Sequence, residues 1–409
     1  SFDSAVVIAL KNNITIKAGK ISEVAYEIGL ENARSKRWPS LNLTLGGSLQ
    51  LGRSIDLFTN LYTNNSYTYQ NSILESRVIL FNWGKINSEI KAQYQSVKTR
   101  HYEIEDQEFN VKATVISSYL DMLLSQELVN INVAKLRQLR EQINILETLD
   151  LAGKASGLSA IRLTGQFLRD SASLNDLRLN LSLKKSAFRN LLNIDSSYNF
   201  TICEVLPTNN DFRIENIPSL KNHPSLLIEE SRLIELEYNL KAQRAGMMPS
   251  ISLSNQLSTF FANTYLNNQG RVRNFGDQLS NNFSTFSYLT LSVPLFNGKS
   301  AVSSYRQSKL NIDNQKLRIE KGKKDLEENL KLLYEKIDNA SQKLRILEQS
   351  YILVDSSYSK VRFAFERGIL PVSEFLDAYQ QRYTTITEQK VAQFQIYFFN
   401  RLLREYLIY

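Results

Sequence analysis

The stretch Trp38-Pro39-Ser40-Leu41-Asn42-Leu43-Thr44-Leu45 alternates leucines with small polar residues directly after a proline. The same arrangement returns in the second half of the chain as Met248-Pro249-Ser250-Ile251-Ser252-Leu253-Ser254. Alternation with a period of two predicts a β-strand with one apolar and one polar face. Proline disfavours helix at the residue before it and is tolerated at the start of a strand. Both stretches therefore predict a switch from helix to strand.

Two further motifs recur in the same order, which indicates that the chain consists of two sequence repeats. Leu10-Lys11-Asn12 returns as Leu220-Lys221-Asn222, and Phe81-Asn82-Trp83-Gly84-Lys85 returns as Phe296-Asn297-Gly298-Lys299. Each copy is predicted as helix, strand, polar loop, strand, very long helix and returning helix. A duplication of this length indicates one architecture with two halves.

The elements of the two repeats are predicted with the following bounds. The first repeat covers residues 1–193, with helix 3–38, strands 40–52 and 72–81, long helix 85–153 and return helix 159–193. The second repeat covers residues 219–409, with helix 219–247, strands 249–261 and 285–296, long helix 300–367 and return helix 372–409. Residues 194–218 break the pattern and are predicted as a linker that forms a small equatorial belt.

The predicted strands have the length and the borders of membrane-crossing strands. About 9–11 residues cross a bilayer at a tilt, and aromatic residues form girdles at both interfaces of outer-membrane barrels. The girdle candidates near the strand ends are Trp38, Phe81, Trp83 and Phe296. Two hairpins cannot close a barrel, and open edges do not persist in lipid, so several chains are expected to share one barrel. Taken alone, the same strands also fit a soluble sandwich.

Both long helices carry a seven-residue repeat, the signature of a left-handed coiled coil. The seam of the second copy is apolar or aromatic throughout and consists of Leu326, Leu330, Leu333, Ile337, Ala340, Leu344, Leu347, Tyr351, Val354, Tyr358 and Val361. The seam of the first copy is more polar and consists of Val111, Val115, Ser118, Met122, Ser125, Val129, Asn132, Leu136, Leu139, Ile143 and Leu146. A helix of about 70 residues extends roughly 100 Å.

The composition of the chain excludes some classes of function. The 409 residues include 49 basic and 41 acidic ones, so the net charge is +8, but the two signs are interspersed. This pattern is typical of solvated helix faces and not of a nucleic-acid-binding surface. No apolar run approaches the ~20 residues of a membrane helix, so any membrane contact is expected to use strands. No signal peptide is visible, and we expect a mature or trimmed chain.

The residue pattern predicts neither enzymatic activity, nor a metal site, nor a cofactor. His101 and His223 are far apart in sequence, and the carboxylates beside His101 fit a polar helix face better than a metal site. Cys203, the one cysteine, has no conspicuous base beside it. The basic stretch 316–324 is interleaved with acidic residues and is interpreted as helix surface.

The order of these motifs resembles the TolC-type outer-membrane efflux family over essentially the whole chain. The resemblance is carried by the paired Pro-Ser strand starts, by Pro294-Leu295-Phe296-Asn297-Gly298, and by Arg367-Gly368-Ile369-Leu370 followed by Glu374-Phe375-Leu376-Asp377. It implies a mixed α and β fold of two tandem repeats, each a β-hairpin plus long antiparallel coiled-coil helices. It also implies a homotrimer with a twelve-stranded transmembrane β-barrel, four strands from each chain, continued by a periplasmic α-helical barrel.

The resemblance places a gate at the periplasmic tip of the second copy. In the family, acidic residues follow the tip glycine, here Gly368, by six and nine positions, which are Glu374 and Asp377 in this chain. Rings of carboxylates around a pore favour cations. The first copy carries Ala160 and Leu163 at the matching places, so only the second copy is expected to supply a ring. The alternative is that both carboxylates are solvated residues stabilised by the helix N-terminus.

The residues beside the tip glycine depart from the family pattern. Some members hold the closed tip with a basic residue two positions after the glycine, but this chain has Leu370. We expect either that Leu370 gives an apolar constriction or that Arg367 replaces the missing charge.

The resemblance also implies partners and a function. A periplasmic adaptor is expected to contact both tips, at Gly153, Lys154, Gly157, Leu158, Gly368 and Ile369. An inner-membrane pump would drive transport, and outer-membrane lipid would surround the barrel. We therefore predict a passive exit duct of a tripartite efflux or type I secretion system, placed in the outer membrane and extending into the periplasm. The alternative is a soluble coiled-coil scaffold or interaction protein.

Overall fold

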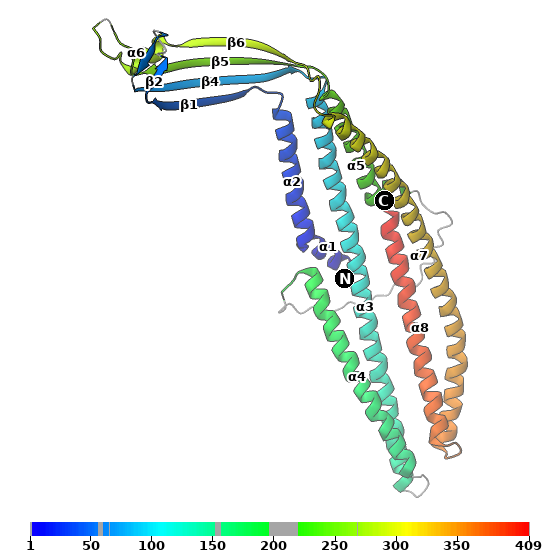
Figure 1. The fold of residues 1–409 in the computed structure, drawn as a ribbon. Helices are drawn as coiled ribbons and strands as arrows, with labels where there is room; N and C mark the ends of the chain where they lie inside the picture. The colour runs from blue at the N-terminus through cyan, green and yellow to red at the C-terminus, as the bar shows by residue number, and fades with distance from the viewer. Residues whose placement is uncertain are drawn as a thin grey trace. The chain divides into compact units, whose positions relative to one another are not determined.

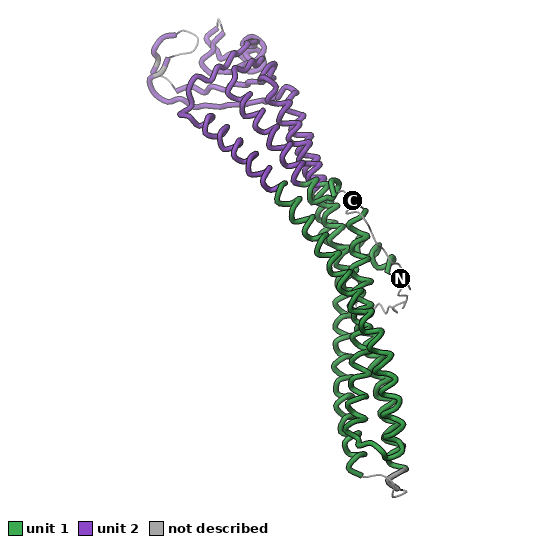
Figure 2. The backbone as a smooth tube through the Cα atoms, turned by 90° about the vertical axis from the view of Figure 1, so that its right-hand side faces the viewer, with its two compact units in different colours: residues 1–22, 101–228, 319–409 green, residues 23–100, 229–318 purple. Residues whose placement is uncertain are grey.

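The computed structural model describes residues 2–55, 60–64, 66–151, 157–195, 220–267 and 269–408. The chain divides into two compact units, which Figure 2 colours separately. The helical unit combines Ser1–Ser22, His101–Ile228 and Ile319–Tyr409, and the sheet unit combines Glu23–Arg100 and Glu229–Arg318. Each unit takes chain from both repeats, so the predicted boundary at 194–218 separates the repeats in sequence but not the compact units.

The sheet unit contains an antiparallel sheet with the strand order β1-β4-β5-β6 (Figure 1). Its strands are β1 (Ser40–Gln50), β4 (Tyr67–Phe81), β5 (Ser250–Ala262) and β6 (Ser284–Ser292). Each repeat supplies one hairpin, and the pairing of β4 with β5 joins the two hairpins. The short strands β2 (Arg53–Ile55) and β3 (Tyr62–Asn64) pair separately. The β4–β5 pairing explains why the two repeats share one compact unit.

The register of the sheet collects the apolar residues of the strands on one face. Leu43 pairs with Leu74, and Leu74 pairs in turn with Leu257. Leucines of this face are largely exposed on the edge strands, with Leu43 at 63% and Leu289 at 65%, and half-buried on the inner strands, as at Leu74 and Leu257. The opposite face carries mainly serine, threonine, asparagine, glutamine and tyrosine side chains. A continuous exposed apolar surface of this kind marks a contact with another protein or with lipid.

Helices continue from the ends of the strands. The helix α2 (Ile14–Ser35) leads towards β1, and α5 (Pro224–Ala245) leads towards β5. The long helices α3 (Lys85–Leu151) and α7 (Ser300–Glu366) follow β4 and β6. Within the described residues, no helix combines the length and the apolar character that crossing a membrane requires.

The repeated Phe-Asn-Gly-Lys motif forms the turn from strand to long helix in both copies. In the first copy Trp83 and Gly84 have φ angles of 55° and 73°, and in the second copy Gly298 and Lys299 have φ angles of 63° and 66°. Residues with a side chain adopt this left-handed conformation only at a cost, whereas glycine adopts it freely. Each turn therefore uses two left-handed residues of which one is glycine, and this requirement explains why the motif recurs.

The helical unit consists of α1 (Phe2–Asn12), α4 (Gly157–Leu192), α8 (Val372–Leu407) and parts of α2, α3, α5 and α7. Most predicted seam residues of the first copy are buried, including Val115 and Met122 at 0% exposure. The second seam is buried at Leu330 but only half-buried at Leu344 and Leu347. The more apolar seam is thus the less buried one within a single chain.

Several element bounds differ from the predicted ones. The predicted helix 3–38 is divided at Asn13, whose Oδ1 accepts a hydrogen bond from Ile16 N at 3.1 Å and so caps α2. The predicted strand 285–296 ends at Ser292, because Pro294 two residues later has no backbone donor. The predicted strand 72–81 begins earlier, at Tyr67, which pairs with Gln50. Residues 196–219, with Cys203 and most of the predicted linker, lie outside the described residues.

His223 lies directly before α5 in the helical unit and is buried between two aromatic rings. Its ring packs edge-on against Phe109 of α3, with centroids 5.1 Å apart, and stacks on Tyr406 of α8 at 5.6 Å. Its Nδ1 lies 2.8 Å from Ser225 Oγ. Burial lowers the pKa of His223 below its ordinary value, because the imidazolium would lose its hydration.

This burial predicts that acid destabilises the helical unit. Folding favours the neutral His223 ring, so the stabilisation is complete above the unfolded-state pKa of about 6.5 and is lost as the pH falls below it through the folded-state pKa. We expect the thermal midpoint, followed by circular dichroism, to fall from about pH 7 to about pH 5 more steeply in the parent than in His223→Phe. Equal slopes in the two proteins would assign the acid sensitivity to other groups.

Candidate functional site

The turn between α7 and α8 is the tip predicted from the sequence. Gly368 N donates to Phe365 O at 2.9 Å, and Ile369 N donates to Ala364 O at 2.9 Å. With a φ of 73° at Gly368, these bonds form a Schellman-type helix end, which requires a left-handed residue at that position. Gly368 therefore ends α7 and allows the chain to turn into α8.

The other predicted tip residues lie at the surface of this turn. The Arg367 guanidinium carbon lies 3.8 Å from the centroid of the Phe363 ring, a cation–π contact along α7. Ile369 is 69% exposed, and Leu370 is half-buried. The turn thus exposes an apolar side chain, Ile369, and the charged Arg367 lies beside it.

The two predicted ring carboxylates lie in the first two turns of α8. Glu374 and Asp377 are both exposed and are three residues apart, so they are neighbours on the helix surface. Phe375 and Tyr379, by contrast, are completely buried in the core of the unit. Within the described part of the chain, neither carboxylate has an ion-pair partner. Both are therefore available to solvent or to an approaching cation.

The predicted tip of the first copy is described only in part. Gly153 and Lys154 lie outside the described residues. Gly157 is the first residue of α4, and Leu158 is an exposed leucine next to it. The contact of these residues with an adaptor stays a prediction.

The predicted girdle residues are exposed at the end of the sheet that adjoins the long helices. Trp38 precedes β1 and is 76% exposed, and Phe296 follows β6 and is 83% exposed. Phe81 ends β4, and its ring lies 5.4 Å from that of Trp83. Exposed aromatic rings at one level of a sheet suit the boundary between lipid and water.

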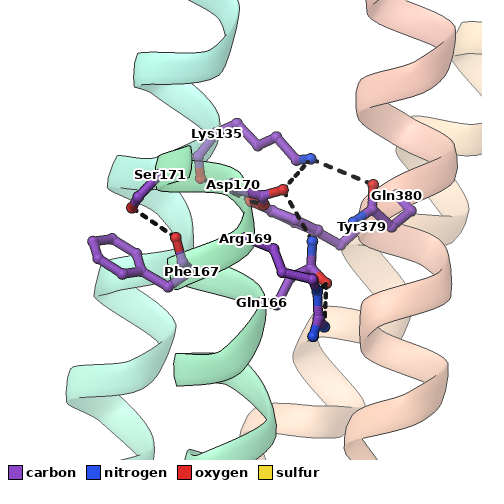
Figure 3. Close-up of polar contacts among 8 residues, drawn as sticks. All are labelled: Lys135, Gln166, Phe167, Arg169, Asp170, Ser171, Tyr379 and Gln380. Carbon is purple, nitrogen blue, oxygen red and sulfur yellow. Dashed lines mark hydrogen bonds and ion pairs between the residues drawn. The ribbon is translucent and has the colours of Figure 1, made fainter. Parts of the chain in front are cut away.

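Close to the tip, buried polar contacts join the first hairpin (α3 and α4) to the second hairpin (α7 and α8). Lys135 Nζ of α3 lies 2.9 Å from Asp170 Oδ1 of α4; Asp170 is buried and the Lys135 side chain is only 12% exposed (Figure 3). The Tyr379 hydroxyl of α8 donates to the Lys135 carbonyl at 2.9 Å and to Asp170 Oδ2 at 3.4 Å. Burial and the charge of Asp170 raise the pKa of Tyr379 far above its ordinary value, so its hydroxyl stays a donor.

A second group of contacts between the hairpins surrounds Gln138 of α3. Gln138 Nε2 donates to the Tyr358 hydroxyl at 2.8 Å, and its Oε1 accepts from the Tyr383 hydroxyl at 2.7 Å and from Arg382 Nη1 at 3.3 Å. Arg382 Nε also donates to Asp355 Oδ1 at 2.6 Å. Burial raises the pKa of Tyr358 to about 12, which keeps this hydroxyl protonated as well. One glutamine amide thus contacts both α7 and α8.

A third contact lies next to the tip turn. Gln142 is buried, and its Nε2 donates to Glu366 Oε1 at 2.9 Å. Glu366, the last residue of α7, also accepts from Arg362 Nε at 3.0 Å. The end of α7 is therefore fixed to α3 one residue before the turn begins.

The sequence contained a signal for these contacts that the apolar seam alone does not reveal. Lys135, Gln138 and Gln142 are three and four residues apart, so they share one face of α3. Each one directly precedes a seam residue, namely Leu136, Leu139 and Ile143. Polar residues that flank a coiled-coil seam contact the neighbouring helix. The identity of their partners on α7 and α8 could not be read from the sequence.

The buried pair Lys135 and Asp170 predicts a large loss of stability when one partner is removed. Lys135→Met or Asp170→Asn leaves the other charge buried without its counterion, at a cost of roughly 3–5 kcal/mol. The double variant Lys135→Met with Asp170→Leu should recover most of this loss. Denaturant unfolding followed by circular dichroism measures both effects.

The more exposed pair Lys184 and Asp121, 3.5 Å apart, provides the control. Lys184→Met should cost less than about 1 kcal/mol, because solvent screens exposed ion pairs. Similar losses at the two pairs would contradict a special role for the buried one.

Comparison with known proteins bears on this arrangement. The family model described as outer membrane efflux protein matches residues 5–193 and 218–397. VceC from Vibrio cholerae is 12% identical, with a TM-score of 0.86 over 99% of this chain and 95% of that one. The Campylobacter jejuni CmeC outer membrane channel is 16% identical, with a TM-score of 0.80 over 99% and 85% of the two chains. The Neisseria gonorrhoeae MtrE outer membrane channel in its open state is 18% identical, with a TM-score of 0.81 over 99% and 88%. No curated protein matched the sequence.

Long paired helices joined to an antiparallel sheet with an exposed apolar face define a channel-forming protein of the outer-membrane type. The chain belongs to the outer membrane efflux protein family, whose model matches one long stretch in each repeat. It is therefore an outer-membrane efflux channel of the TolC type that extends into the periplasm, and its family is not enzymatic. The predicted family, mixed α and β fold, channel function and localisation are confirmed, and the soluble scaffold is excluded.

Proposed function

We propose that three copies of this chain assemble into one passive exit duct. In the described structure, the sheet ends in β1 and β6, each paired on one side only. Lipid cannot satisfy the backbone donors and acceptors of such edges, so open sheets do not persist in membranes. Pairing β1 of each copy with β6 of the next closes three four-stranded sheets into twelve strands. The proposal rests on these open edges and on the exposed apolar face beside them.

Exposed apolar residues on the helices support contacts between copies. The large apolar side chains exposed on α4 and α7 include Leu168, Leu179, Leu183, Leu310, Leu317, Ile346, Ile352 and Leu353. Their removal from water would stabilise an assembly by about 25 cal/mol for each Å² buried. In the proposed trimer these helices line a periplasmic tunnel that continues the barrel.

The proposed duct supplies a water-filled path and leaves the energy to its partners. An inner-membrane pump drives transport, and a periplasmic adaptor seals the junction at the tips. The exposed apolar residues Leu158 and Ile369 suit such a protein contact. Because adaptor contact concentrates at the turns, the tip is also where opening is controlled.

The assembly can be tested directly. We expect the purified protein to require detergent, to migrate as a trimer that dissociates on heating, and to give stepwise conductance in planar bilayers. A water-soluble monomer would contradict the duct.

Glu374 and Asp377 are proposed as the selectivity ring of the tip. Three copies bring up to six exposed carboxylates to one axis, and such a ring attracts cations and repels anions. We expect Glu374→Ala with Asp377→Ala to lower the preference for cations in planar-bilayer recordings. Glu388→Ala, an exposed carboxylate further along α8, serves as the control and should change it less. Unchanged selectivity in the double variant would remove the ring assignment.

The contacts of Gln138 are proposed to hold the second hairpin in the closed position. Gln138→Ala removes one donor and one acceptor shared with α7 and α8, so the open state should become more populated and the conductance should rise. Gln126→Ala is the matched control on the same helix, since the Gln126 amide donates to Asn130 of α3 itself. Equal conductance of the two variants would indicate that closure depends on other contacts.

A further inference from the structure

The strands of the sheet contain two charged residues, and both lie on β4. Glu75 and Arg77 are the only charged residues within the ranges of β1, β4, β5 and β6. They are two positions apart, so their side chains stand on the same face of the sheet. Leu74 and Val78 belong to the opposite, apolar face, where they pair with Leu257 and Leu253. Both charges therefore belong to the polar face.

On the neighbouring strands, each charged residue faces only neutral residues. Arg77 Nε donates to Ser254 Oγ of β5 at 3.2 Å, and this serine is completely buried. Glu75 pairs with Asn42 of β1 and with Gln256 of β5. Among the described residues, no ion pair joins Glu75 or Arg77 to an opposite charge. The two residues therefore place one acidic and one basic side chain two positions apart on one strand, with no ion-pair partner on a described neighbouring strand.

These charges also decide which face of the sheet meets water. A charge on the lipid face of a barrel strand costs about 2–4 kcal/mol near the membrane centre, whereas the lumen face tolerates it. The leucine face is free of charge and is exposed, as a lipid-facing surface requires. The face with Glu75 and Arg77 is consequently the one that borders the aqueous interior.

We propose that Glu75 and Arg77 form a charge belt in the barrel interior, an acidic ring beside a basic ring. This belt sets the charge selectivity of the barrel. This inference rests on the trimer proposed above. Residues two apart on a strand are separated by about 6.6 Å, which is less than the screening length of about 8 Å at physiological salt. Each ring therefore offsets much of the field of the other.

The belt leaves the strand region with little selectivity for the sign of a charge. The rest of this face offers mostly hydroxyl, amide and phenol groups, which bind neither sign of charge preferentially. A belt of balanced rings leaves anionic, cationic and zwitterionic cargo nearly equal passage through the barrel. Discrimination by charge is then left to the tip.

Reversal potentials across a KCl gradient test the belt through opposite effects of two substitutions. Glu75→Gln exposes the basic ring and should shift the permeability ratio towards chloride, whereas Arg77→Gln should shift it towards potassium. The double variant should return to the parental value, and so should Arg77→Lys, which keeps the charge. Both shifts should shrink at about 1 M salt, where the screening length is about 3 Å.

Two controls separate the charge from other effects. Ser254→Ala removes the hydrogen bond of Arg77 but not its charge, and Ser76→Ala lies between the rings on the opposite face. Both should keep the parental reversal potential. The belt is wrong if the trimer conducts but neither single charge variant shifts the reversal potential, or if both variants shift it in the same direction. The proposed duct would not be affected by that result. Failure of the parent to form a conducting trimer would instead contradict the proposed duct.

Discussion

Unpaired strand edges beside an exposed leucine face are the constraint on which the rest of the molecule depends. Backbone donors and acceptors along β1 and β6 need partners that the sheet itself does not supply, and lipid cannot provide them. The two faces of the same sheet demand different surroundings, because one is rich in leucine and the other carries Glu75 and Arg77. A shared barrel satisfies both demands at once. The same sheet fixes where the long helices start, because α3 follows β4 and α7 follows β6.

The helical unit uses polar contacts where a simple coiled coil would use apolar ones. The first seam is the more polar of the two, yet it is the more deeply buried, with Ser125 among its buried residues. Buried ions and amides add little net stability, because their desolvation offsets most of their attraction. Their geometry is nevertheless demanding, since Gln138 satisfies donors and acceptors from two helices only in one arrangement. In the proposed gate, this single arrangement of contacts would define the closed position of the second hairpin.

Local patterns predicted the local structure of this chain. Alternation after Pro39 and Pro249 located the strands, and the recurring Phe-Asn-Gly-Lys motif located turns whose left-handed residues explain the glycine. The contacts between the hairpins could not be predicted in the same way. Lys135 reaches Gln380, which is 245 residues away, and no pattern within either helix specifies that partner. The break at Asn13 was missed because the asparagine caps α2 within a continuous helical pattern.

The pairing of β4 with β5 has a consequence for how the chain reaches its final state. Arg77 and Ser254 are 177 residues apart, whereas the partners within each hairpin are close in sequence. Each β-hairpin can form soon after its own strands are available. The pairing of β4 with β5 must wait for most of the chain, because it closes a very long loop. During that interval β4 and β5 expose edges that fit each other in any copy. Productive folding therefore depends on each chain finding its own second half before it meets the half of a neighbour.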